Sequence, residues 1–356
     1  MEKEFFNNYE DLTGIEAQYE AQKIAFSPIV FQVVRTMRDL SILDILSKSK
    51  DGLTYEELAV KCSLTKYGIQ VLCETALSAG VVFIKDEKVT LSKIGFFINS
   101  DKMTNANMNY NHHVNYQGLF YLDDAIKNEK AEGLKVFGQW DTIYPALSTL
   151  PKDAKDSWFT FDHLYSDSAF SAAIKKLEEL KPKSILDIGG NTGKFATLFA
   201  SSNPNIEITI MDLPQQIKLA KQTIYKKNIQ NIATYEANIL LEDTVIPKGF
   251  DIYWMSQFLD CFKEEQIINI LKKIRVSMNE NSEICIMEPF WDKQSNETAA
   301  YCVINTSPYF TAMANGYSKM FKYTDFIKFI EKAGLEIIED SHEVGLCQTI
   351  IRCKKC

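Results

Sequence analysis

The sequence ILDIGGNTG, residues 185–193, joins a short apolar run to a glycine-rich turn. Branched apolar residues that end in glycines predict a buried strand followed by a tight turn. The next segment, Lys194 to Ser201, carries apolar residues at helical spacing and predicts a helix. In a parallel sheet, such a unit lets the backbone approach a ligand at the carboxyl end of the strand. This stretch therefore predicts a nucleotide-type binding site.

The C-terminal half continues as alternating strands and helices, which is typical of an α/β fold with a parallel sheet covered by helices on both faces. Seven strands are predicted, at residues 184–188, 206–211, 233–237, 250–255, 283–287, 335–340 and 346–352. Further helices are predicted at residues 215–227, 264–278 and 324–333. The last of these is expected to be capped by Thr324 and to end at Gly334.

The N-terminal third predicts helices with a small β element. Proline is favoured in the first helical turn, so Pro28 is expected to begin a helix that runs to Ser47. Thr54 and Glu57 have the spacing of a capping box, and another helix is predicted at 65–79. Residues 81–91 predict a hairpin. Helix, helix and hairpin in this order are typical of a winged helix.

Winged helices often bind DNA, and two observations disfavour that function here. The second helix offers only Lys66 as a basic contact, and the chain has a net charge of −8, which opposes binding to phosphates. A module for dimerisation and for covering a substrate is favoured instead.

Three regions are predicted along the chain. Residues 1–102 form the winged-helix region, and residues 181–356 form the region with the nucleotide-type site. The connector between them, residues 103–180, is predicted to hold a helix at 109–127 and another at 168–180.

Composition places the protein among ordinary globular chains. Its 356 residues are 46% hydrophobic and 24% charged, and no run approaches the roughly 20 apolar residues of a membrane span. The N-terminus lacks the pattern of a signal peptide, so a cytoplasmic location is expected, with no membrane or nucleic-acid partner. The eight cysteines are scattered, and the pair Cys353 and Cys356 is read as a plain tail and not as a zinc site, which requires four ligands.

Glycine spacing and two carboxylates distinguish between candidate nucleotides. The NAD fingerprint GxGxxG requires glycine at the position that Ile188 occupies, so NAD is disfavoured. Asp187 would repel a pyrophosphate but favours the cationic methionine end of S-adenosylmethionine. Asp212 ends the second strand, where an acidic side chain accepts hydrogen bonds from ribose hydroxyls. Each aspartate alone is equally consistent with a capping role.

With these motifs in place, the chain resembles the small-molecule O-methyltransferases typified by caffeic acid O-methyltransferase. LDIGGNTG matches the family's LDxGGGxG, with Asn191 in place of a glycine, and Asp212-Leu213-Pro214 matches its DLP. The resemblance covers nearly the whole chain. It implies a Rossmann-like seven-stranded methyltransferase domain, a homodimer formed through the N-terminal region, and S-adenosylmethionine as cofactor with S-adenosylhomocysteine as product. The cofactor-binding residues that it implies are Asp187, Gly189, Gly190, Gly193, Asp212, Leu213, Asn238, Ile239, Ser256 and Gln257.

The sequence departs from this family where the catalytic histidine is expected. Asp260 stands at the histidine position. Glu288 matches one of the two family glutamates that orient the histidine, and Met320 replaces the other. The catalytic residues inferred are therefore Asp260 and Glu288, with no metal.

Three accounts of the chemistry stay open at this point. Desolvation raises the pKa of Asp260 so that it acts as a base, or alignment of the reactants does most of the work, or a phenol is methylated on a ring carbon. A binding protein that has lost turnover is the alternative from another class. The acceptor expected is a small phenol. Its predicted contacts are His113, Tyr116, Phe161, Tyr165, Phe258, Asn305, Tyr309 and Asn315, the last of which matches a family asparagine.

Overall fold

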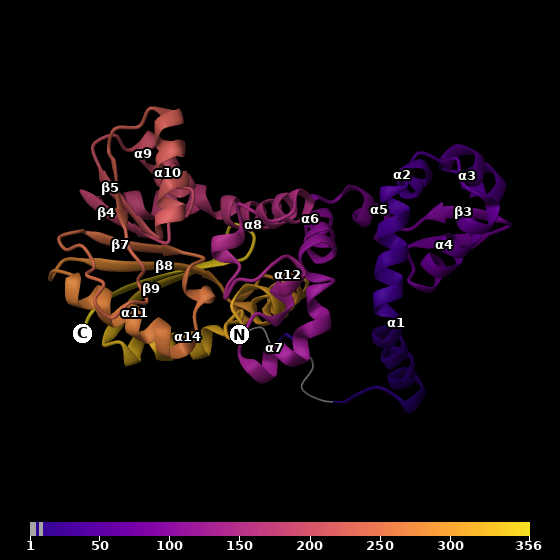
Figure 1. Cartoon of the computed structure of the whole chain (residues 1–356). Helices are drawn as coiled ribbons and strands as arrows, with labels where there is room; N and C mark the ends of the chain where they lie inside the picture. The colour runs from indigo at the N-terminus through magenta and orange to yellow at the C-terminus, as the bar shows by residue number, and fades with distance from the viewer. Residues whose placement is uncertain (1–4, 7–9) are drawn as a thin grey trace. The chain divides into compact units, whose positions relative to one another are not determined.

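The computed structural model describes residues 5–6 and 10–356. The chain forms two compact units, a smaller one that ends at Asn111 and a larger one that contains residues 112–356 (Figure 1). The predicted boundary at 102/103 precedes this division. Residues 112–180 belong to the same unit as the predicted cofactor region, and the three-way division stays a prediction.

The smaller unit has the winged-helix order predicted for it. Its elements are α1 (Gly14–Asp39), α2 (Ile42–Ser47), β1 (Leu53–Thr54), α3 (Tyr55–Cys62), α4 (Lys66–Ser78), β2 (Val82–Lys85), β3 (Lys88–Leu91), α5 (Lys93–Ser100) and α6 (Lys102–Tyr110). The capping box is confirmed, because the Thr54 amide donates to Glu57 Oε2 at 2.8 Å and the Glu57 amide donates to Thr54 Oγ1 at 3.2 Å. The hairpin of β2 and β3 is also confirmed, and Asp86 and Glu87 at its turn both have positive φ.

The prediction that a helix begins at Pro28 is wrong. Helix α1 begins at Gly14 behind a capping box made by Thr13 and Glu16, and Pro28 lies in its interior. Proline at position 28 removes the amide that would donate to the carbonyl of Ile24. The Ser27 hydroxyl donates to that carbonyl at 2.8 Å, which compensates for the missing bond.

The larger unit is built on a seven-stranded sheet with the order β6-β5-β4-β7-β8-β10-β9. The strands are β4 (Ser184–Ile188), β5 (Glu207–Asp212), β6 (Ile232–Glu236), β7 (Ile252–Ser256), β8 (Glu283–Pro289), β9 (Leu335–Val344) and β10 (Gln348–Lys355). All seven predicted strands are present. The predicted seven-stranded fold is confirmed. The strands from β6 to β8 pair in parallel, whereas β10 runs antiparallel to both β8 and β9, so the sheet is mixed.

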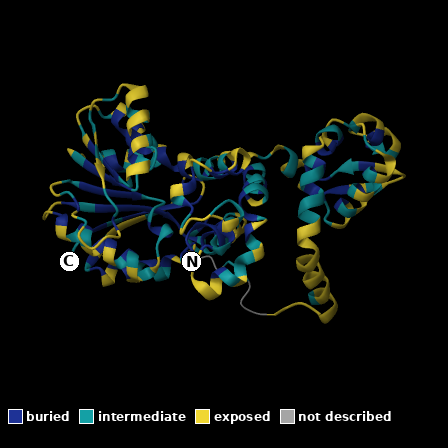
Figure 2. Ribbon diagram, viewed as in Figure 1, coloured by how far each residue is buried: buried dark blue, intermediate teal, exposed yellow. Residues whose placement is uncertain are grey.

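Helices cover the sheet in two groups, each with its own apolar core. The helices are α8 (Lys152–Glu179), α9 (Lys194–Ser202), α10 (Pro214–Lys227), α11 (Glu264–Ser277) and α14 (Tyr323–Lys332). Residues of α8, α9 and α10 share one core cluster, and residues of α11 and α14 share the other. Strands β4, β7 and β8 are therefore buried almost throughout (Figure 2). This burial explains why the central strands read as continuous apolar runs in the sequence.

Helices outside the sheet differ most from the prediction. The predicted helix at 109–127 is broken into the end of α6, a π-helical turn η1 (Asn111–Asn115), a 3-10 turn η2 (Gly118–Tyr121) and α7 (Leu122–Asn128). A Cβ at Gly118 would lie 1.9 Å from Met313 Sδ, so close packing fixes this irregular path. The predicted helix at 168–180 is only the end of α8. The predicted cap of α14 is also wrong, since α14 begins at Tyr323 without a side-chain cap, although Gly334 ends it with a positive φ as predicted.

Short elements complete the larger unit, and they surround the end of the sheet that carries the predicted site. They are η3 (Glu132–Val136), η4 (Tyr144–Ala146), η5 (Leu259–Cys261), η6 (Trp291–Lys293), α12 (Glu297–Ile304), α13 (Ser307–Tyr309) and η7 (Phe310–Ala314). No helix in the described part of the chain is long and apolar enough to cross a membrane. The cytoplasmic location stays a prediction.

Candidate active site

The glycine-rich turn between β4 and α9 has little room for side chains. Gly189 and Gly193 have φ values of 76° and 75°, and Asn191 has a φ of 50°, which asparagine tolerates better than most residues. A Cβ at Gly189 would lie 2.2 Å from the ring of Phe258. A Cβ at Gly190 would lie 2.7 Å from Asp187 Oδ2. The turn therefore needs glycine at 189 and 190, and it presents backbone at the carboxyl end of β4.

Asp187 is a buried carboxylate with an acceptor that no described residue satisfies. Its exposed fraction is 2%, and its Oδ2 atom has no hydrogen-bond partner among the described residues. Burial, together with the charge of Asp212, raises the pKa of Asp187 to about 8. Such a group favours a ligand that brings a donor or a positive charge.

Asp212 fixes the glycine-rich turn from the neighbouring strand. Its Oδ2 accepts from the Asn191 amide at 2.8 Å, and its Oδ1 accepts from the Leu213 amide at 2.7 Å. Burial raises the pKa of Asp212 to about 6, and these two amides limit the rise. Each carboxylate oxygen keeps a second lone pair and can accept another hydrogen bond. The contact of Asp212 with a ribose hydroxyl stays a prediction.

The other predicted cofactor residues lie at the ends of adjacent parallel strands. Asn238 follows β6, and its Oδ1 accepts from the Leu240 amide at 3.0 Å. Ile239 belongs to the core, with 6% of its surface exposed. Gln257 follows Ser256 at the end of β7 with a positive φ, and its buried Oε1 has no partner in the described chain. The edge formed by β4, β5, β6 and β7 thus combines a close backbone turn with three acceptors that no described residue satisfies, on Asp187, Asn191 and Gln257, which fits a ligand rich in donors.

Asp260 and Glu288 form a buried carboxyl pair beside this edge. Asp260 lies in η5 and is 6% exposed, and its Oδ1 accepts from the Cys261 thiol at 3.4 Å. Glu288 is 1% exposed, and its Oε1 accepts from the amides of Phe258 and Leu259 at 2.9 and 2.7 Å. Glu288 therefore positions the backbone that carries Asp260, and its Oε2 atom has no partner among the described residues.

The two carboxyl groups cannot both ionise at low cost. Burial raises the pKa of Asp260 to about 6. Burial, followed by the charge of Asp260, raises the pKa of Glu288 well above its usual value. The pair therefore favours a state that keeps one proton between the two groups.

Asn315 supports this segment through its side chain. Its Nδ2 donates to the Cys261 carbonyl at 2.9 Å and to Ser318 Oγ at 2.8 Å, and its Oδ1 accepts from the amides of Tyr317 and Ser318. The side chain is 2% exposed, and both its ends are engaged. These hydrogen bonds give Asn315 a positioning role for η5, and its contact with substrate stays a prediction.

Replacing Asn315 with alanine is expected to lower the free energy of unfolding by about 2 kcal/mol or more, because it leaves buried acceptors and amides unsatisfied. The matched control is Asn305→Ala, because Asn305 is exposed and its Nδ2 donates to the Tyr301 carbonyl of its own helix at 2.8 Å. That change is expected to stay within about 0.5 kcal/mol. Urea unfolding measures the free energy of unfolding of both variants. Equal losses in Asn315→Ala and Asn305→Ala would contradict the positioning role of Asn315.

Aromatic side chains pair with one another beside Asp260 in the sequence and on α8. Phe258 and Phe262 flank Asp260 with ring centroids 4.9 Å apart. Phe161 and Tyr165 on α8 have centroids 4.8 Å apart. Across the chain, Trp158 Nε1 donates to the buried Tyr309 hydroxyl at 2.6 Å, which joins α8 to α13. Phe258 and Phe262 thus supply apolar rings on either side of Asp260, and burial raises the pKa of this carboxyl.

Three predicted substrate residues make their described contacts elsewhere. Asn305 is exposed at the end of α12, and the described structure gives it no contact with Asp260. His113 lies in the π-helical turn η1 and Tyr116 directly follows it, so the two side chains do not share the face of a regular helix. The ring centroid of His112 lies 4.7 Å from that of His113 and 6.5 Å from that of Tyr116. Their contact with substrate stays a prediction.

Sequence reasoning missed Tyr144 and Asp162. The Tyr144 hydroxyl accepts from Asn315 Nδ2 at 3.4 Å and interacts with the Cys261 thiol. Asp162 lies on α8 one turn after Trp158, and the predicted helix began only at 168. The sequence could have placed Asp162 on this helix, because position 162 continues the helical spacing of Ala154, Trp158 and Ala169.

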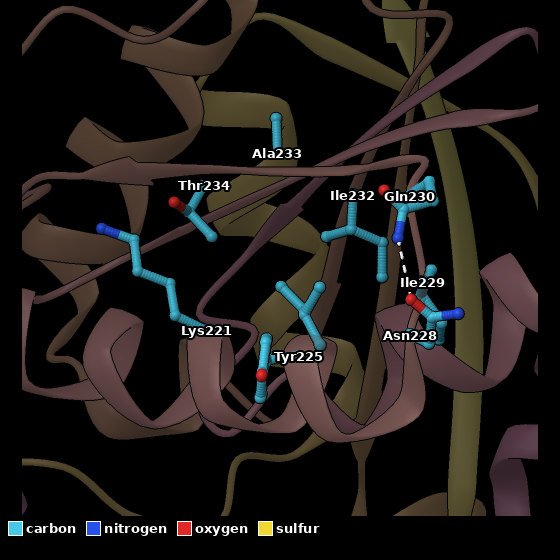
Figure 3. Close-up of a pocket in the computed structure, with 9 residues that line it drawn as sticks. Lys221, Tyr225, Asn228, Ile229, Gln230, Ile232, Ala233 and Thr234 are labelled. Carbon is cyan, nitrogen blue, oxygen red and sulfur yellow. Dashed lines mark hydrogen bonds between the residues drawn. The ribbon is translucent and has the colours of Figure 1, made fainter.

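A separate pocket of about 330 Å³ lies between α10 and the edge strand β6 (Figure 3). It is lined by Lys221, Ile224, Tyr225, Asn228, Ile229, Gln230, Ile232, Ala233 and Thr234. Its lining contains no carboxylate and none of the predicted site residues, and it is not the candidate active site.

Comparisons with known proteins agree with this arrangement. An O-methyltransferase domain matches residues 120–336, and a Dimerisation2-like domain matches residues 18–89. The L-tyrosine C(3)-methyltransferase of Streptomyces lavendulae is 20% identical over 317 residues, which cover 87% of this chain and 85% of that protein.

Two solved structures share the fold. The S-adenosylmethionine-dependent methyltransferase SibL in its apo form has a TM-score of 0.71 at 18% identity, covering 94% of this chain and 98% of that chain. The O-methyltransferase NcsB1 from neocarzinostatin biosynthesis, in complex with S-adenosylmethionine and 2-hydroxy-5-methyl naphthoic acid, has a TM-score of 0.65 at 13% identity. It covers 92% of this chain and 96% of that chain.

Proposed function

Given that this chain belongs to the family of S-adenosylmethionine-dependent O-methyltransferases, we propose that it transfers a methyl group to the hydroxyl of a small phenol. The observation that carries the proposal is the buried pair Asp260 and Glu288, which places an ionised carboxylate among aromatic rings. The aromatic ligand in the NcsB1 complex supports an aromatic acceptor.

The residues at the sheet edge fit the cofactor. The glycine-rich turn admits a nucleoside at close range, and Asp187 Oδ2 is an acceptor for its amino-acid end. Asp212 holds the turn in place and keeps lone pairs for ribose hydroxyls. When bound, S-adenosylmethionine supplies a methyl group that is already activated for nucleophilic attack.

Asp260 takes the proton of the acceptor hydroxyl in this proposal. An unperturbed aspartate is a weak base near neutral pH. The pKa of about 6 brings Asp260 closer to the pH range in which a general base works best. The proton then lies on Asp260 while the phenolic oxygen becomes the nucleophile. Glu288 Oε1 accepts from the amides of Phe258 and Leu259, which holds η5 in place.

Methylation of a ring carbon is a second candidate reaction. The relative named L-tyrosine C(3)-methyltransferase, which matches over 87% of this chain, favours it. In that reaction Asp260 takes the phenolic proton and the carbon ortho to the oxygen gains the methyl group. Asp260 then releases its proton to solvent, and the ionised carboxylate takes the ring proton, which restores the aromatic ring.

We also propose that the protein forms a homodimer through its smaller unit. The Dimerisation2-like match at 18–89 supports this assembly. Large apolar side chains also stand exposed in this unit, with exposed fractions of 82% at Ile15, 76% at Ile24 and 58% at Phe97. Burying them against a second copy would remove that apolar surface from water.

The experiment is a product screen with methyl-labelled S-adenosylmethionine against simple phenols and catechols. The expected result is labelled product together with S-adenosylhomocysteine, and NMR of the product distinguishes a methoxy group from a ring methyl group. Thermal stabilisation by S-adenosylhomocysteine without product from any phenol would instead indicate a binding protein.

A further inference from the structure

We propose that Cys261 is a positioning residue for the base of the reaction, because its thiol donates a hydrogen bond to Asp260 Oδ1 and leaves Oδ2 to take the phenolic proton. This inference rests on the proposed function, since it concerns how the same carboxylate is oriented and at what pH it ionises. As a consequence, the thiol helps to set the lower pH limit of activity.

The Cys261 thiol contacts the carboxylate directly. Its Sγ atom lies 3.4 Å from Asp260 Oδ1, within the range of a hydrogen bond from sulfur. The other oxygen, Oδ2, receives no hydrogen bond from a described residue. One oxygen of Asp260 is thus held by the chain, and the other is left to accept from a ligand.

The thiol stays a donor near neutral pH. Burial, followed by the charge of Asp260, raises the pKa of the Cys261 thiol well above its usual value. A protonated thiol is a weak donor that carries no negative charge. It therefore favours the ionised carboxylate, and its hydrogen bond lowers the pKa of Asp260 against the larger effect of burial, which together give the value of about 6.

Residues of other segments hold Cys261 in this position. Asn315 Nδ2 donates to the Cys261 carbonyl at 2.9 Å and to the Tyr144 hydroxyl at 3.4 Å. Tyr144, in η4, also forms a hydrogen bond with the Cys261 thiol. Within η5, the Cys261 amide donates to the Phe258 carbonyl at 3.2 Å. The main chain and the thiol of Cys261 are therefore both fixed, which gives a weak donor a defined direction.

The other ionisable groups that interact with Asp260 are all acids. They are Glu288 of β8, Tyr144 of η4, Tyr309 of α13 and Asp162 of α8. A negative charge on any of them would oppose the ionisation of Asp260. The Cys261 thiol acts in the opposite direction, so its loss should be visible in the pH dependence of the reaction.

Replacing Cys261 with alanine removes the donor, and the rise of kcat/KM with pH should move to higher pH by about half a unit to one unit. With catechol as acceptor, kcat/KM should fall by about two- to fivefold near pH 6 and by less than about twofold at pH 8, where Asp260 is ionised with or without the thiol. Cys261→Ser keeps a donor and should keep the rise at or below its original pH. A merely structural loss would lower kcat/KM equally at every pH.

Cys62→Ala is the matched control, because Cys62 in α3 is, like Cys261, a partly buried free cysteine. It should leave the pH profile unchanged. Binding of S-adenosylhomocysteine should be unchanged in Cys261→Ala as well, which shows that the cofactor site is intact.

Infrared spectroscopy tests the contact without turnover. A hydrogen bond weakens the S–H bond and lowers its stretching frequency, which lies where other protein groups do not absorb. In the unmodified protein loaded with S-adenosylhomocysteine, one S–H band should move to higher frequency as the pH falls through about 6, because protonation of Asp260 weakens the acceptor. Cys261→Ser should lack this band, and in Asp260→Asn no S–H band should move over the same range.

Three results would overturn the inference: an unchanged pH profile in Cys261→Ala, an equal upward move in Cys261→Ser, or S–H bands that do not respond to pH in the unmodified protein. If Cys261→Ala does not fold, the unmodified protein and Asp260→Asn decide through the same band. A pH-dependent band without methylation of any phenol would preserve the contact between Cys261 and Asp260 and reject the proposed activity.

Discussion

Replacing Asp260 with asparagine is expected to lower kcat by a factor of about 10² to 10⁴, the usual contribution of a general base. Asparagine keeps the size of the side chain and cannot accept the phenolic proton. Because the pKa of Asp260 is about 6, kcat/KM of the unmodified protein should rise with pH through that value and level off above it. Asp260→Asn should lose this limb of the pH profile.

The control for this prediction is Asp243→Asn, an exposed aspartate in the loop after β6. It should keep both the rate and the pH profile. Binding of S-adenosylhomocysteine to Asp260→Asn should also stay normal, which separates a lost base from a damaged cofactor site. Full activity in Asp260→Asn would show that alignment of the reactants alone accounts for the rate.

Replacing Asp187 with asparagine is expected to weaken S-adenosylhomocysteine binding by about 10- to 100-fold, since a charge-assisted hydrogen bond is lost. The same change should stabilise the protein without ligand. The folded pKa of about 8 lies above the value near 3.9 expected for an unfolded chain. The ionised carboxylate therefore destabilises the fold increasingly as the pH rises from about 4 to about 8.

Urea unfolding at several pH values checks the sign of this effect. The gain in the free energy of unfolding for Asp187→Asn should be small near pH 4 and largest near pH 8. An exposed aspartate such as Asp243, replaced in the same way, should show no comparable trend. Loss of stability in Asp187→Asn at pH 8 would mean that the carboxylate already has a partner in the folded protein.

The sequence by itself determined the features that depend on neighbouring residues. The strand, turn and helix around Gly189 and Gly193 follow from an apolar run and from glycines that only a tight turn requires. The capping box of Thr54 and Glu57 and the hairpin at Asp86 are equally local. The central strands β4, β7 and β8 could be predicted because burial on both faces makes their apolar runs continuous.

Only the tertiary structure decided the features that depend on distant residues. Strand β10 inserts antiparallel beside β8, a pairing that no local pattern encodes. Helix α8 extends back to Lys152 because its inward face packs against the sheet and is joined to Tyr309. Propensity is a weak prior that such packing overrides.

The carboxyl pair shows the same limit most clearly. The resemblance to a known family singled out Asp260 and Glu288, but the sequence does not reveal how deeply they are buried. Folding leaves Asp260 6% and Glu288 1% exposed, and that burial is the main cause of their raised pKa values.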